Sequence, residues 1–167
     1  SQDLSGRVVA ITGASSGIGE ATALAAAAAG AAVSLAARRG DRIEALAARI
    51  REEGGSAVAI PTDVTDEASA RAFVAGTTEA LGGLDALVNN AGLMLLGAVT
   101  GADTQEWRRM IDVNCLGLLY CTHAAIEVMG PAGAGHIVNV SSVAGRRAQL
   151  GSAVYNMTKF GVVGFSE

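Results

Sequence analysis

The chain has 167 residues, the length of one domain, and 50% of them are hydrophobic, which is enough for a substantial core. Its formal net charge of -4 lacks the cationic excess with which proteins bind phosphate backbones, so no nucleic acid partner is expected. Residues 1–7 contain no apolar signal region, and the uncharged stretch 21–37 has too much alanine and glycine for a membrane span. We therefore expect a cytoplasmic protein with no membrane partner.

Short apolar runs alternate with longer amphipathic segments along the whole chain. Strands are predicted for residues 8–12, 32–36, 57–60, 86–89 and 136–140. Helices are predicted for residues 18–29, 41–53, 67–81 and 104–129, and from near Tyr155 onward. The strands are continuously apolar, which is typical of parallel strands covered on both faces. The sequence therefore predicts a single α/β domain with a doubly wound parallel sheet of the Rossmann type.

A glycine-rich turn, Thr12–Gly19, lies between the first predicted strand and the first predicted helix. At this position a dinucleotide pyrophosphate can use the free amides of a helix N-terminus. Gly13 is expected to permit the tight turn, Gly17 the close approach of the phosphates, and Gly19 the close packing of helix and strand. The residues expected to bind the cofactor here are Gly13, Ser15, Ser16, Gly17, Ile18 and Gly19. The alternative is a glycine-rich turn that binds no ligand.

The end of the second predicted strand indicates which dinucleotide binds. Sites for NAD usually hold an acidic residue there, but the sequence from Leu35 is Leu-Ala-Ala-Arg-Arg and offers no carboxylate. An arginine can bind a 2′-phosphate through its planar, bidentate fork, whereas a carboxylate would repel it. We predict NADP(H), with Arg38 as the leading ligand of the phosphate, Arg39 as its support, and NAD(H) as the second cofactor. The alternative is that both arginines are solvated charges.

The cysteines and histidines predict neither a disulfide nor a metal site. Cys115 and Cys121 are six residues apart in one predicted helix, so their side chains point about 240° apart. His123 and His136 have no ligand-like spacing with cysteines or carboxylates. We expect packed cysteines in a reducing compartment.

Tyr155 and Lys159 have the spacing that places two side chains on one face of a helix. A phenol titrates near pH ~10 in water, so acid–base chemistry at neutral pH requires a neighbouring cation that lowers its pKa. Ser142 precedes Tyr155 by thirteen residues, a spacing that favours it over its neighbour Ser141. The alternative for Tyr155 and Lys159 is an ordinary pair on a helix surface.

These motifs together resemble the short-chain dehydrogenase/reductase family, of the NADP-preferring type, over nearly all of the chain. The motifs that carry the resemblance are Thr12–Gly19, Asp63-Val64, Asn89–Gly92, Asn114, Ser142, and Tyr155 with Lys159. The resemblance implies that Tyr155 exchanges a proton with the substrate oxygen. It also implies that Lys159 lowers the pKa of that phenol and holds the nicotinamide ribose. By the same resemblance, Ser142 steadies the substrate oxygen and Asn114 belongs to a proton relay.

Further cofactor contacts are implied for the segments that follow the third and fourth predicted strands. The residues concerned are Asp63, Val64, Asn89, Ala91 and Gly92, with Asp63 expected at the adenine. Asp and Asn also favour caps and turns, so a local structural role is the alternative. Leu93–Leu96 could line an apolar substrate pocket or pack in a loop, and Arg146 and Arg147 could contact a substrate anion or be solvated.

Hydride transfer to a carbonyl leaves an alkoxide that must be protonated as it forms, which agrees with these implied roles. The expected function is hydride transfer between NADP(H) and a small-molecule carbonyl or secondary alcohol, with Tyr155 as general acid/base. Alternatives are a dehydratase or epimerase on the same fold, and a non-catalytic NADP-binding module. Family members usually continue with two more strands and a substrate loop, so we expect this chain to be truncated. The resemblance also implies that the complete protein is a homodimer or homotetramer.

Overall fold

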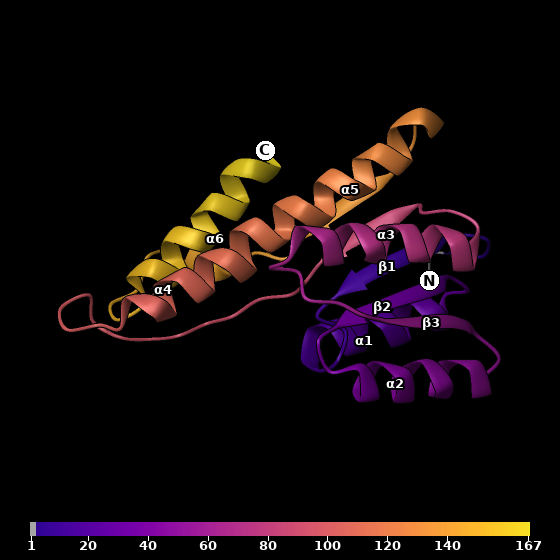
Figure 1. Cartoon of the computed structure of the whole chain (residues 1–167), viewed down its shortest axis with the longest axis horizontal. Coiled ribbons are helices and arrows are strands. Elements are labelled where there is room, and N and C mark those ends of the chain that lie inside the picture. The colour runs from indigo at the N-terminus through magenta and orange to yellow at the C-terminus, as the bar shows by residue number, and fades with distance from the viewer. Residues whose placement is uncertain (1–2) are drawn as a thin grey trace.

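Five strands alternate with helices in the predicted order (Figure 1). The computed structural model describes residues 3–167. The strands are β1 (Val8–Thr12), β2 (Ala32–Ala37), β3 (Ser56–Pro61), β4 (Ala86–Asn89) and β5 (His136–Asn139). The helices are α1 (Gly17–Ala28), α2 (Gly40–Glu52), α3 (Glu67–Leu81), α4 (Thr104–Ile111), α5 (Gly117–Ala132) and α6 (Ala153–Ser166). The predicted α/β class is confirmed.

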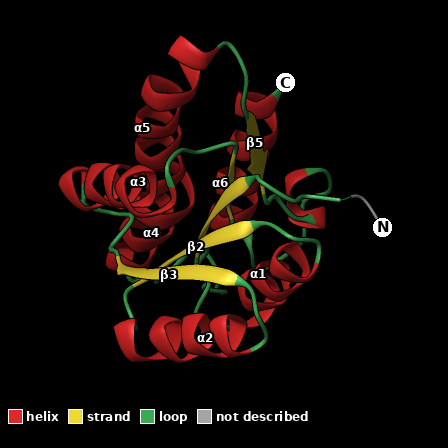
Figure 2. Cartoon of the chain, turned by 90° about the vertical axis from the view of Figure 1, so that its right-hand side faces the viewer, coloured by secondary structure: helices red, strands yellow, loops and turns green. Residues whose placement is uncertain are grey.

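All strand pairs are parallel, in the order β3-β2-β1-β4-β5. Figure 2 shows this twisted sheet with helices on both sides. The chain first builds β2 and β3 on one side of β1 and then crosses to place β4 and β5 on the other. In open α/β sheets, ligands bind at the carboxyl ends of the strands where the order reverses in this way. The topology therefore places a ligand site beyond the ends of β1 and β4.

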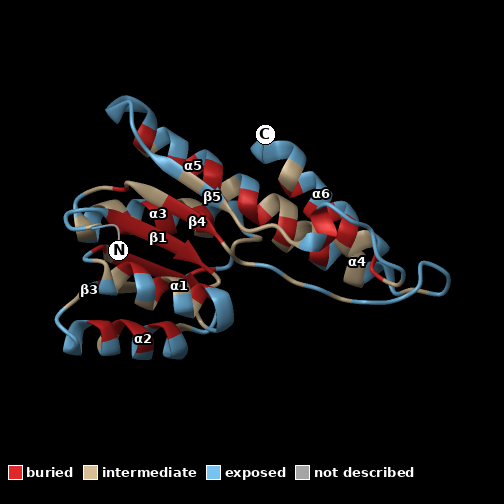
Figure 3. Ribbon diagram, turned by 180° about the vertical axis from the view of Figure 1, so that it is seen from behind, coloured by how far each residue is buried: buried red, intermediate tan, exposed pale blue. Residues whose placement is uncertain are grey.

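Each face of the sheet has its own hydrophobic core because neighbouring residues of a strand point to opposite faces. Ile11 and Leu35 pack with α2 residues such as Ile43 on one face. Ala10 and Leu87 pack with Phe73 of α3 and buried residues of α5 on the other. Figure 3 shows the central strands as buried and the outer helix surfaces as exposed. The continuous burial of β1 explains its continuously apolar sequence.

The predicted uninterrupted helix from Thr104 to Met129 is wrong in one respect. A π-helical segment, Asp112–Leu116, separates α4 from α5. Gly117 directly follows it, and a Cβ atom there would lie 2.7 Å from Cγ2 of Val64, so only a residue without a side chain fits. Single π-helical turns inside α-helices occur frequently at functional sites.

By length and composition alone, the helical run Thr104–Ala132 could cross a membrane, with a mean hydropathy of 1.2. Within the fold, 44% of the most apolar stretch of this run is buried, and α5 packs against α3 and β4. A core helix of a soluble protein passes the same test, so this is weak evidence for a span.

Cys115 and Cys121 are both free thiols. Burial raises the pKa of Cys121 to about 12, which keeps its thiol protonated. Among residues 3–167, the structure places no group of three or more His, Cys, Asp and Glu side chains where they could hold a metal ion.

Candidate active site

A groove of about 710 Å³ is lined by segments that follow the carboxyl ends of β1 to β4. Its walls come from the glycine turn, the end of β2, the segments after β3 and β4, and the junction of α4 with the π-helical segment. The residues predicted to bind the cofactor that line it are Gly13, Ser15, Ser16, Ile18, Arg38, Arg39, Asp63, Val64, Ala91 and Gly92. The groove therefore brings together residues from distant parts of the sequence.

The glycine turn has the tight bend expected at Gly13 and the close packing of helix and strand expected at Gly19. Gly13 has a φ of +66°, and a Cβ atom on it would lie 2.8 Å from Cα of Ala91. A Cβ atom on Gly19 would lie 2.4 Å from the carbonyl oxygen of Gly13, so α1 can approach the turn only without a side chain there. Gly17 has a φ of +60° and faces open space. The backbone amides at the start of α1 therefore remain accessible to an anion.

Two arginines follow β2 at the groove. The guanidinium of Arg39 donates hydrogen bonds to Oγ of Ser15 at 2.8 Å and to Oγ of Ser16 at 2.9 Å. Serine hydroxyls are neutral, so these bonds orient the arginine and leave its charge uncompensated. Arg38 lines the same groove, and no side-chain hydrogen bond or ion pair of Arg38 is formed within residues 3–167.

The two neighbouring asparagines after β4 have different positions. The side chain of Asn90 lines the groove and donates to the carbonyl oxygens of Thr12 at 3.0 Å and Gly13 at 3.3 Å. Asn89 is only 4% exposed, and its Nδ2 donates to Thr122 and to Asn139, both at 2.9 Å. The side chain of Asn89 therefore links β4 to α5 and β5, and the neighbouring Asn90 lines the groove. The cofactor contact of Asn89 stays a prediction.

Asp63 lies at the groove and also closes a local turn. It lines the groove, and its Oδ1 accepts hydrogen bonds from the amide of Thr65 at 3.0 Å and from the hydroxyl of Thr65 at 2.8 Å. These bonds close a local turn after β3, as expected for aspartate. The neighbouring Val64 packs against Gly117 and thus joins this turn to α5.

Lys159 lies on α6, is only 5% exposed, and is the only lysine of the chain. Its Nζ donates to the carbonyl oxygen of Val140 at 2.8 Å and lies 5.9 Å from the ring centroid of Tyr155. Burial lowers the pKa of Lys159, and the nearby Cys115 opposes this shift. The helix thus places the cation beside the phenol ring, as the spacing predicted.

Asn114 and Gly92 connect Lys159 to the groove. Asn114 is 2% exposed and lies in the π-helical segment. A Cβ atom on Gly92 would lie 3.6 Å from Oδ1 of Asn114 and 3.7 Å from Nζ of Lys159. Gly92 also lines the groove, so the lysine lies next to a residue of the groove wall, although Tyr155 and Lys159 are not themselves part of the lining.

The two serines after β5 differ in what their hydroxyl groups contact. Ser141 donates to the carbonyl oxygen of Lys159 at 3.0 Å and thereby attaches this segment to α6. Ser142 is half-buried and caps the short 3₁₀ helix Val143–Gly145 by accepting from the amide of Ala144 at 3.1 Å. Within residues 3–167 the Ser142 hydroxyl donates to no acceptor, so its hydrogen is available to a ligand.

Several residues of the site were not predicted from the sequence. Asn90 and Arg109 line the groove, and Thr158 contacts Asn114 at 3.1 Å. Asn90 lies within the quoted motif, and the alternation of side chains along a strand was the signal that separates it from Asn89. Arg109 had no such signal, because only the folded chain brings α4 to the groove.

The two segments that could contact a substrate, Leu93–Leu96 and Arg146–Arg147, lie in different surroundings. Leu93 lines the groove, whereas Leu95 and Leu96 line a separate cavity of about 20 Å³ together with Trp107 of α4. The predicted apolar segment is thus divided between groove and loop packing. Arg146 and Arg147 are both exposed.

Known proteins have similar sequences and the same fold. The sequence pattern of the short chain dehydrogenase family matches residues 7–167. An uncharacterized oxidoreductase of Staphylococcus haemolyticus is 39% identical over 161 residues, covering 96% of this chain and 69% of its own. Glycine betaine reductase ATRR of Emericella nidulans is 43% identical over 157 residues, but the match spans 94% of this chain and only 12% of that protein.

A solved structure shows the same agreement. The crystal structure of a short-chain type dehydrogenase/reductase from Mycobacterium marinum superposes with a TM-score of 0.93 at 37% identity, covering 98% of this chain and 67% of that one. The family pattern extends from before β1 to the end of α6 and includes every segment of the groove. The chain belongs to the short-chain dehydrogenase/reductase family, whose members are oxidoreductases.

Proposed function

We propose that the protein transfers a hydride between NADP(H) and a small-molecule carbonyl or secondary alcohol, with Tyr155 as the general acid/base. The observation that carries this proposal is the buried ammonium of Lys159, held 5.9 Å from the ring centroid of Tyr155 beside Gly92 of the groove. A protein that only bound a nucleotide would not need a buried cation next to a phenol. When bound, NADPH supplies the hydride that the carbonyl carbon accepts.

Tyr155, Ser142, Lys159 and Asn114 have separate roles in this proposal. Tyr155 donates its phenolic proton to the substrate oxygen during reduction and accepts it back during oxidation. The free hydroxyl hydrogen of Ser142 holds that oxygen in place. Lys159 stabilises the negative charge that remains on Tyr155, and Asn114 belongs to the path that replaces the proton.

A preference for NADP(H) over NAD(H) is supported by the end of β2. Arg38 and Arg39 both line the groove, and the segment Leu35–Arg39 has no carboxylate. A 2′-phosphate carries the charge that two guanidinium groups can bind in a planar, bidentate manner. Ser15 and Ser16 would then exchange their hydrogen bonds with Arg39 for contacts with the same anion.

The complete protein is proposed to form a homodimer or homotetramer and to act in the cytoplasm. Support for assembly comes from exposed apolar side chains on α5 and α6. These are Leu119, Ile126, Met157, Phe160 and Phe165. Support for a reducing compartment comes from the two free thiols, Cys115 and Cys121.

The test is consumption of NADPH by the complete protein in the presence of aldehydes, ketones and quinones. We expect turnover of at least one of these classes, and a loss on the order of 10²-fold or more in Tyr155→Phe, which removes the transferable proton. Tyr120→Phe is the matched control, because Tyr120 is the other tyrosine of the chain and lies on α5. Turnover by Tyr155→Phe at the rate of the parent would refute the acid/base role.

A further inference from the structure

The side-chain amide of Asn114 is held on both sides by groups from distant segments. Its Oδ1 accepts from the amide of Leu93 at 2.7 Å, and its Nδ2 donates to the carbonyl oxygen of Leu93 at 2.8 Å. The same Nδ2 donates to Oγ1 of Thr158 at 3.1 Å. Asn114 is 2% exposed and Thr158 is 1% exposed, so water does not replace these partners.

The hydroxyl of Thr158 determines which way the Asn114 amide faces. Its hydrogen is donated to the carbonyl oxygen of Tyr155 at 2.7 Å, so Oγ1 presents only lone pairs to Asn114. Only the NH₂ group of an amide can face such an acceptor, and only the amide oxygen can face the N–H of Leu93. All of these contacts are therefore compatible with a single orientation of Asn114.

This orientation determines where the segment after β4 lies relative to Lys159. Leu93 is bound to Asn114 through both its amide and its carbonyl, and the preceding Gly92 lies between Asn114 and Nζ of Lys159. Both residues line the groove. Thr158 directly precedes Lys159 on α6, so one turn of this helix carries both the cation and the hydroxyl that fixes Asn114.

We infer that Thr158 is a positioning residue, which acts through Asn114 to hold Gly92 and Leu93 against Lys159. Its effect on the loop follows from hydrogen bonds alone. Its effect on turnover rests on the proposed function, because it assumes that Lys159 and Tyr155 take part in a reaction beside Gly92 of the groove.

The loop effect is measured by amide hydrogen–deuterium exchange at Leu93 in the full chain without nucleotide. Thr158→Val keeps the shape of the side chain and removes the hydroxyl, and we expect exchange on the order of tenfold faster at Leu93. Thr158→Ser restores the hydroxyl and should restore slow exchange. Exchange in Thr158→Val that equals the parent, or in Thr158→Ser that equals Thr158→Val, would overturn the inference.

Thr77→Val is the matched control for a general loss of stability. Thr77 is also buried, donates to Phe73 at 2.8 Å and is bonded to Ser34 at 2.7 Å, but it lies on α3 outside the groove. Its replacement should leave exchange at Leu93 unchanged, and an equal acceleration there would overturn the inference.

If Thr158→Val does not fold, Thr158→Cys replaces it, because a thiol is a weaker acceptor. Parent-like exchange in that variant would contradict the role, and faster exchange would support it.

Turnover separates this inference from the proposed function. With a substrate in hand, Thr158→Val should lower kcat without a matching rise in KM for NADPH, and Thr158→Ser should recover kcat. A parent-like kcat in Thr158→Val would overturn its role in the reaction. If the parent itself transfers no hydride, the proposed function fails, whereas exchange at Leu93 still decides whether Thr158 positions the loop.

Discussion

Lys159 is buried at 5% exposure, and its protein partner is a neutral carbonyl oxygen, that of Val140. Lysines are almost never this buried unless they are paired with an opposite charge. Removing the charged ammonium from water makes the folded state less stable. For the same reason, burial lowers the pKa of Lys159. Groups of this kind cluster at functional sites, where an anion formed in the reaction or supplied by a ligand compensates the charge.

The desolvation of Lys159 predicts a pH-dependent stability. The lysine has an ordinary pKa of 10.5, and the folded state lowers it. Between the lowered value and 10.5 the unfolded chain binds more protons than the folded one, so the free energy of unfolding rises with pH in this window. Lys159→Met lacks this dependence. In urea titrations without nucleotide, its stability relative to the parent should therefore decrease as the pH rises toward 10.5.

A relative stability of Lys159→Met that did not change across this pH range would contradict the desolvation argument. The control is Cys115→Ala with Lys159 retained. It removes the titrating neighbour that opposes the pKa shift of Lys159. Because Lys159 is the only lysine of the chain, ¹³C-methylation of amines reports its titration with little overlap.

Arg38 predicts cofactor discrimination. Arg38→Gln removes a charge-assisted bond to a 2′-phosphate, which corresponds to roughly a tenfold to hundredfold rise in the Kd for NADPH. The Kd for NADH should stay the same, because that nucleotide has a hydroxyl at this position. Fluorescence titration of both nucleotides measures the ratio. Arg42→Gln is the matched control, since Arg42 is exposed on α2 and does not line the groove. Equal effects on NADPH and NADH would exclude Arg38 as the phosphate ligand.

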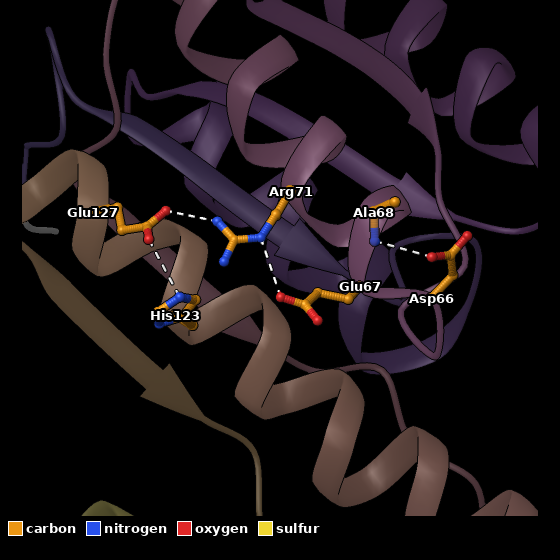
Figure 4. A network of polar contacts seen from close by, with 6 residues as sticks. All are labelled: Asp66, Glu67, Ala68, Arg71, His123 and Glu127. Atoms are coloured by element: carbon orange, nitrogen blue, oxygen red, sulfur yellow. Dashed lines mark hydrogen bonds and ion pairs between the residues drawn. The ribbon is translucent and has the colours of Figure 1, made fainter.

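At the scale of elements, packing rather than ion pairs holds the helices on the sheet. Figure 4 shows Arg71 of α3 between Glu67 of the same helix and Glu127 of α5, with His123 beside Glu127. Arg71 and Glu127 are 42% and 53% exposed, and pairs this exposed contribute only ~0–1 kcal/mol. Burial of Phe73 between the helices and the sheet contributes more, about 2 kcal/mol or above.

The sequence predicts elements well where their signal is local. The bounds of β1 to β4 and of α1 to α3 agree with the structure within one residue, because apolar runs, glycines and caps determine them. The π-helical segment was missed because its cause is not local. Asn114 bonds to Leu93 and Thr158, which are 21 and 44 residues away in the sequence. The same reason hid Arg109 and Thr158, whereas the glycine turn and the Tyr155–Lys159 pair are contained in short motifs.

The close contact of α1 with the glycine turn predicts opposite outcomes at two helical glycines. Gly19→Ala places a methyl group 2.4 Å from a backbone oxygen, and such overpacking costs about 1–3 kcal/mol or prevents the turn from forming. Gly161→Ala, on α6, meets no atom within 4 Å and should stabilise the isolated chain by roughly 0.5–1 kcal/mol. Urea unfolding measures both, and NADPH affinity should fall only for Gly19→Ala. Equal stability changes would show that α1 tolerates a side chain at the turn.

At the scale of the whole molecule, α4 and α6 lie side by side beyond the carboxyl ends of the strands, and α5 runs from them onto the sheet beside α3, as Figures 1 and 3 show. The helices α5 and α6 present apolar residues outward. On α5, Leu119 and Ile126 are seven residues apart and share a face, and on α6 Met157 and Phe160 do the same at three residues. Exposed apolar patches of this kind mark interfaces.

These outward faces predict that assembly of the complete protein depends on α5 and α6. Ile126 is 53% exposed and Phe160 is 45% exposed, so a charge at either position leaves the core of the subunit intact. A glutamate buried in an interface without a partner is strongly unfavourable. Ile126→Glu and Phe160→Glu should therefore shift the oligomer toward the monomer in light scattering after size exclusion. Ile18→Glu is the control, because Ile18 is 66% exposed but lines the groove on α1. A stable oligomer in both helix variants would place the interface elsewhere.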